Sequence, residues 1–318
     1  MASSESFSVD KCPAEYKPYS CHLADRDRQL AKVELGEDDA IREQSVQQMR
    51  DWIARHPHIR KCRTDPVFLL RFLRARKFNL PDACEMLERY LSMRQVFKIW
   101  YENLDPADKY MKQLVVTEGA LPLGLDERGR MVALVKVRNF DPTKYSCFHL
   151  GRFTHMALEA FYDDEQVQIG GGVAIIDCEG AAMAHFTLFK LSDIRNFMEH
   201  LKVALPVRVQ EIHVIGLPRI GAALGELILS FASAEMKRRI HFHATLADAL
   251  KLLEQSLLPM EYGGVQDARD ITDRLRRRLD DARKTLLLLD EMEIDVAPYA
   301  GFWNQSNDED VEFGMEID

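Results

Sequence analysis

The stretch from residue 206 to 264 constrains the fold more than any other part of the chain, because strand and helix patterns alternate within it. Short apolar runs at 209–215 and 239–243 predict two buried strands. Residues 218–236 between them predict one helix with an apolar stripe, formed by Ile220, Leu224, Leu227, Ile228 and Phe231. Such a helix is either a crossover helix packed on a sheet or a lid over a cavity, and its spacing alone favours the crossover helix.

Two earlier runs extend this alternation toward the N-terminus. Residues 131–138 and 173–177 are short and rich in β-branched side chains, which is typical of buried strands. The segment 124–129 before them is expected to be a turn. Helical patterns cover 148–162, 188–201 and 246–258. Strands that alternate with helices form βαβ units, so we predict an α/β domain with a largely parallel sheet and helical cover.

The parts before and after this region have different patterns. Residues 23–104 carry apolar faces at helical spacing, and Asp65-Pro66 has the form of a helix start. Residues 271–290 predict an amphipathic helix, and the acidic segment 305–318 is expected to be disordered. The predicted units are a flexible N-terminal arm (1–22), an all-helical domain (23–104), the α/β domain (105–265), and a C-terminal amphipathic helix with an acidic tail (266–318).

The composition excludes several classes of protein. The 318 residues carry a net charge of −9, which argues against a general nucleic-acid binder, although local basic clusters can still meet an anionic membrane. The six cysteines are scattered without a CxxC pair, which favours reduced thiols in the cytosol. The sequence shows neither a signal peptide nor an apolar run of about 20 residues. We expect a cytoplasmic protein that associates with membranes transiently and at their surface.

The motifs of common enzyme classes are missing. The chain has no GxSxG nucleophile motif and no GxxxxGK[ST] phosphate loop. Asp177 and Glu179 follow a strand, where they are expected to bond turn backbone rather than form a catalytic pair. His241 and His243 are expected to face opposite sides of their strand and so not to share a metal ion. We predict no enzyme activity, no catalytic residue, no cofactor and no metal site.

Five segments together carry a family resemblance. They are residues 68–78 (FLLRFLRARKF), 175–180 (IIDCEG), 206–218, 240–243 (IHFH) and 258–264 (LPMEYGG). In this order the chain resembles the CRAL-TRIO lipid-transfer proteins over residues 25–265, in the branch of the α-tocopherol transfer protein and the retinaldehyde-binding protein. The resemblance implies a small helical domain followed by an α/β sandwich, with an apolar cavity under a lid helix.

The function that the resemblance implies is carriage of one hydrophobic lipid, tocopherol-like or retinoid-like, between membranes. A tail of a dozen carbons is worth on the order of 10 kcal/mol when buried, at about 0.8 kcal/mol per CH₂, so we expect release at a membrane with the lid displaced. Few polar residues occur among the cavity candidates, so the ligand should have one hydrogen-bonding head group. Carried over by position, the ligand-binding candidates are Thr154, Leu158, Ala174, Ile176, Met183, Phe189, Phe197, Leu201, Val209 and Ile212.

The same resemblance assigns two further sets of residues. The apolar stripe of the lid helix, from Ile220 to Phe231, lines the cavity, meets the membrane, or does both. A basic cleft for phosphoinositide head groups is implied at Arg76, Arg208, Lys237 and Arg239. Gln210 and Glu235 depart from the branch, which has basic residues at these positions. A head group bound in the cleft would bias the lid toward opening.

Two other functions remain open at this point. A phospholipid- or phosphoinositide-sensing adaptor in trafficking or signalling would use the lipid site only to recognise a membrane. The apolar stripe of residues 271–290 could then bind its protein partner. A lipid hydrolase is the third hypothesis, and the missing nucleophile motif counts against it.

Overall fold

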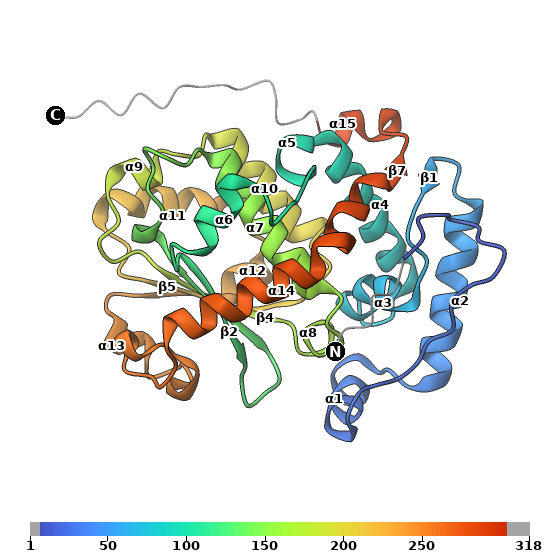
Figure 1. The fold of residues 1–318 in the computed structure, drawn as a ribbon, viewed down its shortest axis with the longest axis horizontal. Coiled ribbons are helices and arrows are strands. Elements are labelled where there is room, and N and C mark those ends of the chain that lie inside the picture. Colours follow the sequence, from blue (N-terminus) through green and yellow to red (C-terminus); the bar gives the residue numbers. More distant parts are fainter. Residues whose placement is uncertain (1–6, 304–318) are drawn as a thin grey trace.

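The molecule has a helical N-terminal part and a sheet covered by helices (Figure 1). The computed structural model describes residues 7–303, except for the side chain of Ile220. The N-terminal elements are α1 (Asp25–Leu35), α2 (Asp39–Arg55), β1 (Ile59–Lys61), α3 (Pro66–Ala75), α4 (Leu80–Val96) and α5 (Lys98–Tyr101). The predicted acidic tail at 305–318 lies outside the described residues.

The main sheet has five strands in the order β2-β3-β4-β5-β6. They are β2 (Ala120–Leu125), β3 (Met131–Lys136), β4 (Gly172–Asp177), β5 (Val209–Ile215) and β6 (Ile240–His243). The pairs from β3 to β6 are parallel and β2 is antiparallel to β3, which confirms the predicted fold class. The sequence patterns missed β2, because its Pro122 and Gly124 are unusual in strands. The turn begins only at Asp126, whose carboxylate accepts from the backbone N–H groups of Arg128 and Arg130.

Two predicted helices are wrong in their extent. The remaining helices of this part are α6 (Lys109–Val115), α7 (Cys147–Tyr162), α8 (Glu165–Gly170), α9 (Met183–Phe186), α10 (Leu191–Val203), α11 (Arg219–Phe231), α12 (Ala234–Arg239) and α13 (Leu246–Ala249). The helix predicted at 218–236 breaks because Ala232 is extended and Ser233 caps α12, accepting from the Met236 N–H at 3.1 Å. The helix predicted at 246–258 stops at Ala249. Beyond it, the Leu257 and Leu258 carbonyls accept hydrogen bonds from Gln266.

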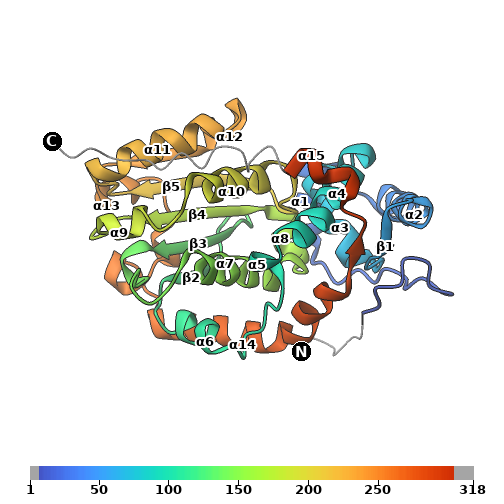
Figure 2. The same cartoon turned by 90° about the horizontal axis from the view of Figure 1, so that it is seen from above.

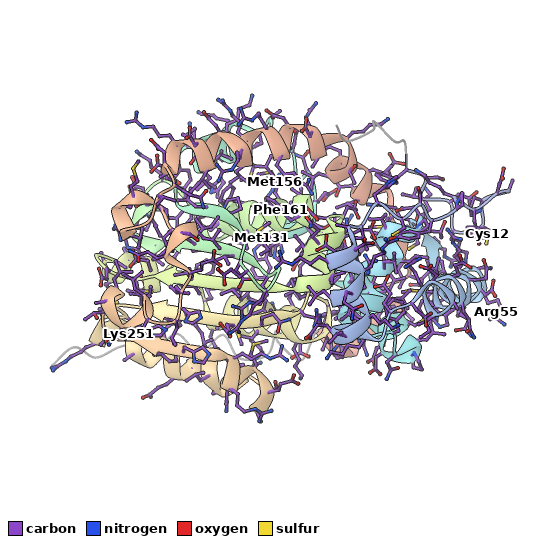
Figure 3. The ribbon with its side chains drawn as sticks, turned by 90° about the horizontal axis from the view of Figure 1, so that it is seen from below. Cys12, Arg55, Met131, Met156, Phe161 and Lys251 are labelled. Carbon is purple, nitrogen blue, oxygen red and sulfur yellow. The ribbon has the colours of Figure 1, made fainter. Side chains whose placement is uncertain are left out.

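The C-terminal part completes the core of the molecule. The helix α14 (Ala268–Leu288) buries the apolar stripe that contains Ile271, Leu275 and Leu279. Figure 3 shows Phe161 of α7 beside this helix, where the Arg278 guanidinium lies 5.1 Å from the ring centroid. Further on, β7 (Glu293–Ile294) pairs with β1, and α15 (Ala300–Trp303) ends the described chain. The hypothesis that this stripe binds a partner is therefore wrong, because the protein's own core covers it.

The described part of the N-terminal arm, residues 7–22, has no helix or strand but is held by several contacts. The Phe7 ring lies 4.0 Å from the Arg63 guanidinium, and the Tyr19 hydroxyl donates to Glu165 at 2.7 Å. The carbonyl of Val9 accepts a hydrogen bond from the backbone N–H of Cys62 at 2.8 Å. These contacts hold residues 7–22 against the rest of the protein, whereas the composition of this segment predicts a flexible arm.

Arginines of α3 join the N-terminal helices to the sheet domain through buried ion pairs. Arg71, only 1% exposed, donates to Glu159 at 2.9 Å and to Asp163 at 2.8 Å. Arg74 is fully buried and donates to Glu37 at 2.7 Å. A second hydrogen bond of 2.8 Å runs from Arg74 to Glu165 on α8. Charges buried in this way are tolerated only when each one has a partner of opposite sign.

The carboxylate of Asp163 stays ionised. Burial raises the pKa of Asp163, but the nearby guanidiniums of Arg63 and Arg71 outweigh that effect and lower the pKa to about 2. A carboxylate whose folded pKa is depressed stabilises the fold above its unfolded pKa of about 4. That contribution is lost as the pH falls toward 2, so the network is complete throughout the neutral range.

Replacing Arg71 tests the weight of this network. Arg71→Met should lower the free energy of unfolding by about 3 kcal/mol, because Glu159 would keep only Tyr90 and Arg94, and Asp163 only Arg63. Urea unfolding at pH 7 measures the change. The control, Arg276→Met, removes an exposed ion pair with Asp273 and should cost less than about 1 kcal/mol. Equal losses in the two variants would contradict the assignment.

Candidate functional site

A cavity of about 360 Å³ lies between one face of the sheet and its covering helices. The strands contribute Ile176, Ile212, Val214, Ile240 and Phe242. The opposite wall comes mainly from α7, α10 and α11. Figure 2 shows α7 on the side of β2 and β3, with α11 and α12 along the side of β5. The cavity therefore lies over β4, β5 and β6, with α7 toward one end and α11 toward the other.

The structure brings some of the predicted ligand-binding residues to this cavity and leaves others outside. The lining residues among them are Thr154, Ile176, Phe189, Phe197, Leu201 and Ile212. Leu158, Ala174 and Met183 are half-buried but do not line the cavity, and Val209 lies in a neighbouring cleft. Spacing along one helix or strand selects a face, and it does not say how far along that face the cavity extends.

The lid helix α11 faces the cavity with part of the predicted stripe and with two glycines. Leu224 and Ile228 line the cavity, together with Gly221 and Gly225. A side chain at Gly221 would come within 2.8 Å of Leu217, so the glycine allows the lid to pack closely. Of the other predicted lid residues, Leu227 is half-buried outside the lining, Phe231 lines the neighbouring cleft, and the side chain of Ile220 is outside the described part.

Lining residues that the sequence patterns missed come from separate parts of the chain. Trp100 belongs to α5 and reaches the cavity from the N-terminal part, while His155 follows Thr154 on α7. Val214 could have been found from Ile212, because residues two apart on a strand share a face. No local signal marks Trp100, since its contact with the cavity depends on how α5 packs against α7.

A second hollow of about 530 Å³, here called the basic cleft, lies next to the cavity. Its charged lining residues are Arg76, Lys77, Lys202, Arg208 and Arg239 against Glu34, Asp82 and Glu235. Of the predicted phosphoinositide residues, Arg76, Arg208 and Arg239 therefore meet in one place, whereas Lys237 is exposed outside the lining. The basic cleft shares Met198, Leu201 and Met236 with the cavity, so the two hollows have a common wall.

The arginines of the basic cleft are only partly neutralised. Burial lowers the pKa of Arg208, the nearby Glu34 raises it, and the like charge of Arg239 lowers it further. Arg208 donates to the Ile169 carbonyl, and Arg239 donates to the Val209 carbonyl and pairs with Glu235. The Nε atoms of Arg76 and Arg208 are buried without a hydrogen-bond partner. An anion in the basic cleft would supply the missing acceptor and charge.

Three histidines gather on the face of the sheet that points away from the cavity. The His213 ring stacks at 5.1 Å from His241 and 5.2 Å from His243. The expectation that His241 and His243 face opposite sides is wrong, because residues two apart on a strand share a face. Across residues 7–303, no group of three or more His, Cys, Asp or Glu side chains has a geometry suited to a metal ion.

Two family models and several known proteins match this chain. A model of the CRAL/TRIO domain matches residues 118–264, and a model of the Pinta-like UBA domain matches 38–111. Clavesin-2 of Homo sapiens is 31% identical over 254 residues, covering 79% of this chain and 77% of that protein. Clavesin-1 of Mus musculus is 32% identical over 237 residues, covering 74% and 67%. The crystal structure of Sfh5 superposes with a TM-score of 0.46 at 11% identity, over 80% of this chain and 92% of that one.

Within residues 7–303, no helix combines the length and the apolar character that crossing a bilayer requires.

Two buried histidines beside the cavity predict a loss of stability in acid. Burial lowers the pKa of His200 to about 3, and burial together with the nearby His200 lowers the pKa of His155 well below its usual value. The unfolded chain binds protons at these positions below about pH 6.5 and the folded chain does not. His200 should therefore cost about 2 kcal/mol of stability between pH 7 and pH 5, and His155 should add a loss in the same direction.

Urea unfolding at pH 7, 6 and 5 measures this dependence. His200→Asn keeps a polar group near Tyr101 and should remove about 2 kcal/mol of the loss between pH 7 and pH 5. His22→Asn, at an exposed position, is the control. An unchanged slope in His200→Asn would contradict the assignment.

Proposed function

Since this chain belongs to the CRAL/TRIO family, whose members are non-enzymatic lipid-binding proteins, we propose that it carries one tocopherol-like or retinoid-like lipid between membranes. The observation that supports this most directly is the apolar cavity between the sheet and the lid helix α11. Its volume of about 360 Å³ lies within the range of small-molecule sites. The carrier would work on the cytoplasmic side of membranes and bind their surface only transiently.

Release of the lipid requires the lid to move. Burial of a long apolar tail is worth on the order of 10 kcal/mol, so escape into water is too slow to serve delivery. The lid is bounded by two points where the backbone can turn, Gly216 with φ +62° and the break at Ala232 and Ser233. Movement of α11 about these points would expose Leu224 and Ile228, which could then contact the lipid of a membrane.

The basic cleft would couple this movement to an anionic membrane. An incoming phosphoinositide phosphate would compete with Glu235 for Arg239, at the end of α12. The basic cleft and the cavity share a wall that includes Met236. A side chain of this wall that moves in the basic cleft would therefore also move in the lining of the cavity. A head group there would thus bias the lid toward its open position. Lys237, exposed near the same end of α12, would add attraction to the membrane surface.

The adaptor hypothesis has lost its main support. It relied on a free apolar stripe in residues 271–290, and that stripe is buried against the protein's own core. No other observation favours it over the carrier.

Blocking the cavity tests the carrier proposal. Ile176→Arg should abolish retention of lipid, because a charged side chain in an apolar cavity lacks a partner and fills the space. Native mass spectrometry of the purified full-length protein, followed by extraction, measures the lipid per chain. Leu252→Arg places the same charge at an exposed apolar position and should leave retention unchanged. A protein that holds no lipid without any substitution, and takes none from a panel, would remove the proposal.

Neutralising the basic cleft tests the release step separately. Arg208→Ala/Arg239→Ala should keep the bound lipid and slow its transfer to phosphoinositide vesicles about thirtyfold, because each basic residue contributes about 1 kcal/mol near an anionic surface. Transfer to phosphatidylcholine vesicles should not change. The charge-matched control is Arg276→Ala/Arg277→Ala on the exposed face of α14. Undiminished transfer to phosphoinositide vesicles would exclude the basic cleft as the trigger.

A further inference from the structure

A buried indole N–H at the α7 end of the cavity has no acceptor. Trp100 is 6% exposed and lines the cavity, and its Nε1 atom has no hydrogen-bond partner. The indole N–H is a donor only, and leaving such a donor buried and unpaired costs free energy. Unpaired buried donors are uncommon in folded proteins, so a ligand oxygen is a natural partner for this one.

The position of this donor is fixed by a glycine on α7. A side chain at Gly151 would begin 3.1 Å from Cδ1 and 3.4 Å from Nε1 of Trp100, so the glycine lets the polar edge of the indole approach α7. His155 follows Gly151 by one helical turn and lies on the same face, next to Thr154. All four of these residues line the cavity, so the indole of α5 and two polar side chains of one turn of α7 meet at this end.

His155 offers a second polar group at this end. Its ring packs 4.0 Å from the Tyr101 ring and 5.0 Å from the His200 ring, measured between centroids. The Tyr101 hydroxyl is already engaged with His200 Nδ1 at 3.1 Å, and no hydrogen bond to the His155 ring is found in the described chain. Burial lowers the pKa of His155, so its ring is neutral and has one donor and one acceptor nitrogen.

The charges around the two hollows select different ligands. The described lining of the cavity contains no lysine or arginine, and its one acid, Asp193, accepts from the Lys190 backbone N–H at 3.0 Å. A phosphate inside would be buried without a cation, which is strongly unfavourable. The basic cleft, by contrast, is lined by Arg76, Arg208 and Arg239.

We propose that the cavity has a dedicated polar end, where Trp100 Nε1–H and the His155 ring bind the single uncharged oxygen group of the lipid. The group is a hydroxyl or carbonyl oxygen, and phosphate-bearing lipids are excluded from the cavity and bind only outside it. This inference rests on the proposed function, since it assumes that the cavity holds a lipid. It adds the orientation of that lipid, with the oxygen at α7 and the apolar tail toward the lid.

A matched series of probes tests the polar end. The probes are phytol, the corresponding hydrocarbon phytene and phytyl monophosphate, each competing with tritiated phytol on the full-length, delipidated protein. The unsubstituted protein should bind phytol about tenfold more tightly than phytene, as one satisfied hydrogen bond allows. Phytyl monophosphate should compete at least a hundredfold more weakly than phytol, since its phosphate finds no cation in the cavity.

Variants then assign this preference to residues. Trp100→Phe keeps an aromatic ring. It should weaken the binding of phytol severalfold and leave the binding of phytene unchanged. His155→Leu should change the two affinities in the same direction. The control is Phe189→Leu in the apolar part of the cavity. It should weaken the binding of phytol and the binding of phytene equally. Thermal unfolding of each variant establishes that it is folded.

The outcomes separate this inference from the proposed function. Equal binding of phytol and phytene by the unsubstituted protein would overturn the polar end and leave the carrier proposal standing. The polar end would also be overturned if Trp100→Phe and His155→Leu both kept the full preference for phytol over phytene. Strong competition by phytyl monophosphate that disappears in Ile176→Arg would place phosphate inside the cavity and also overturn it. Failure of all three probes to bind would overturn the inference, whereas the carrier proposal is decided by the lipid that the purified protein holds or takes from a panel.

Discussion

The buried ion pairs of α3 hold the wall of the cavity in place. Arg71 binds Glu159 and Asp163 at the end of α7, and Arg74 binds Glu165 on α8. Buried charges tolerate few arrangements, because each alternative would leave one of them unpaired. Glu159 lies one turn beyond His155, so the pairing that satisfies Glu159 also sets the rotation of α7 about its axis. The N-terminal helices thereby determine which side chains of α7 face the cavity.

Local patterns in the sequence predict the parallel strands well and the shape of the cavity only in part. The strands β3 to β6 are short runs of β-branched and apolar residues. Such runs can be recognised as strands from the sequence alone, without knowledge of the fold. The break between α11 and α12 depends on a single cap at Ser233, inside a segment whose spacing otherwise continues as a helix. Trp100 could not be predicted, because its place in the wall results from contact between segments about fifty residues apart in the sequence.

The two hollows divide the recognition of a lipid and the recognition of a membrane between different chemistries. The cavity is apolar with a few neutral hydrogen-bonding groups, whereas the basic cleft has arginines that lack full compensation. Their common wall at Met198, Leu201 and Met236 is made of flexible apolar side chains. Met and Leu side chains can repack at low cost, so this wall can pass a displacement from one hollow to the other.

The pairing of β1 with β7 has a consequence for how the protein is made. Ile59 is the partner of Ile294, and Trp303 packs in the same core as Phe68 and Tyr90. A chain emerging from the ribosome therefore cannot finish its first helical unit until residues near its other end have been synthesised. Apolar surface of α3 and α4 remains uncovered during that interval, which exposes this unit of the nascent chain to aggregation.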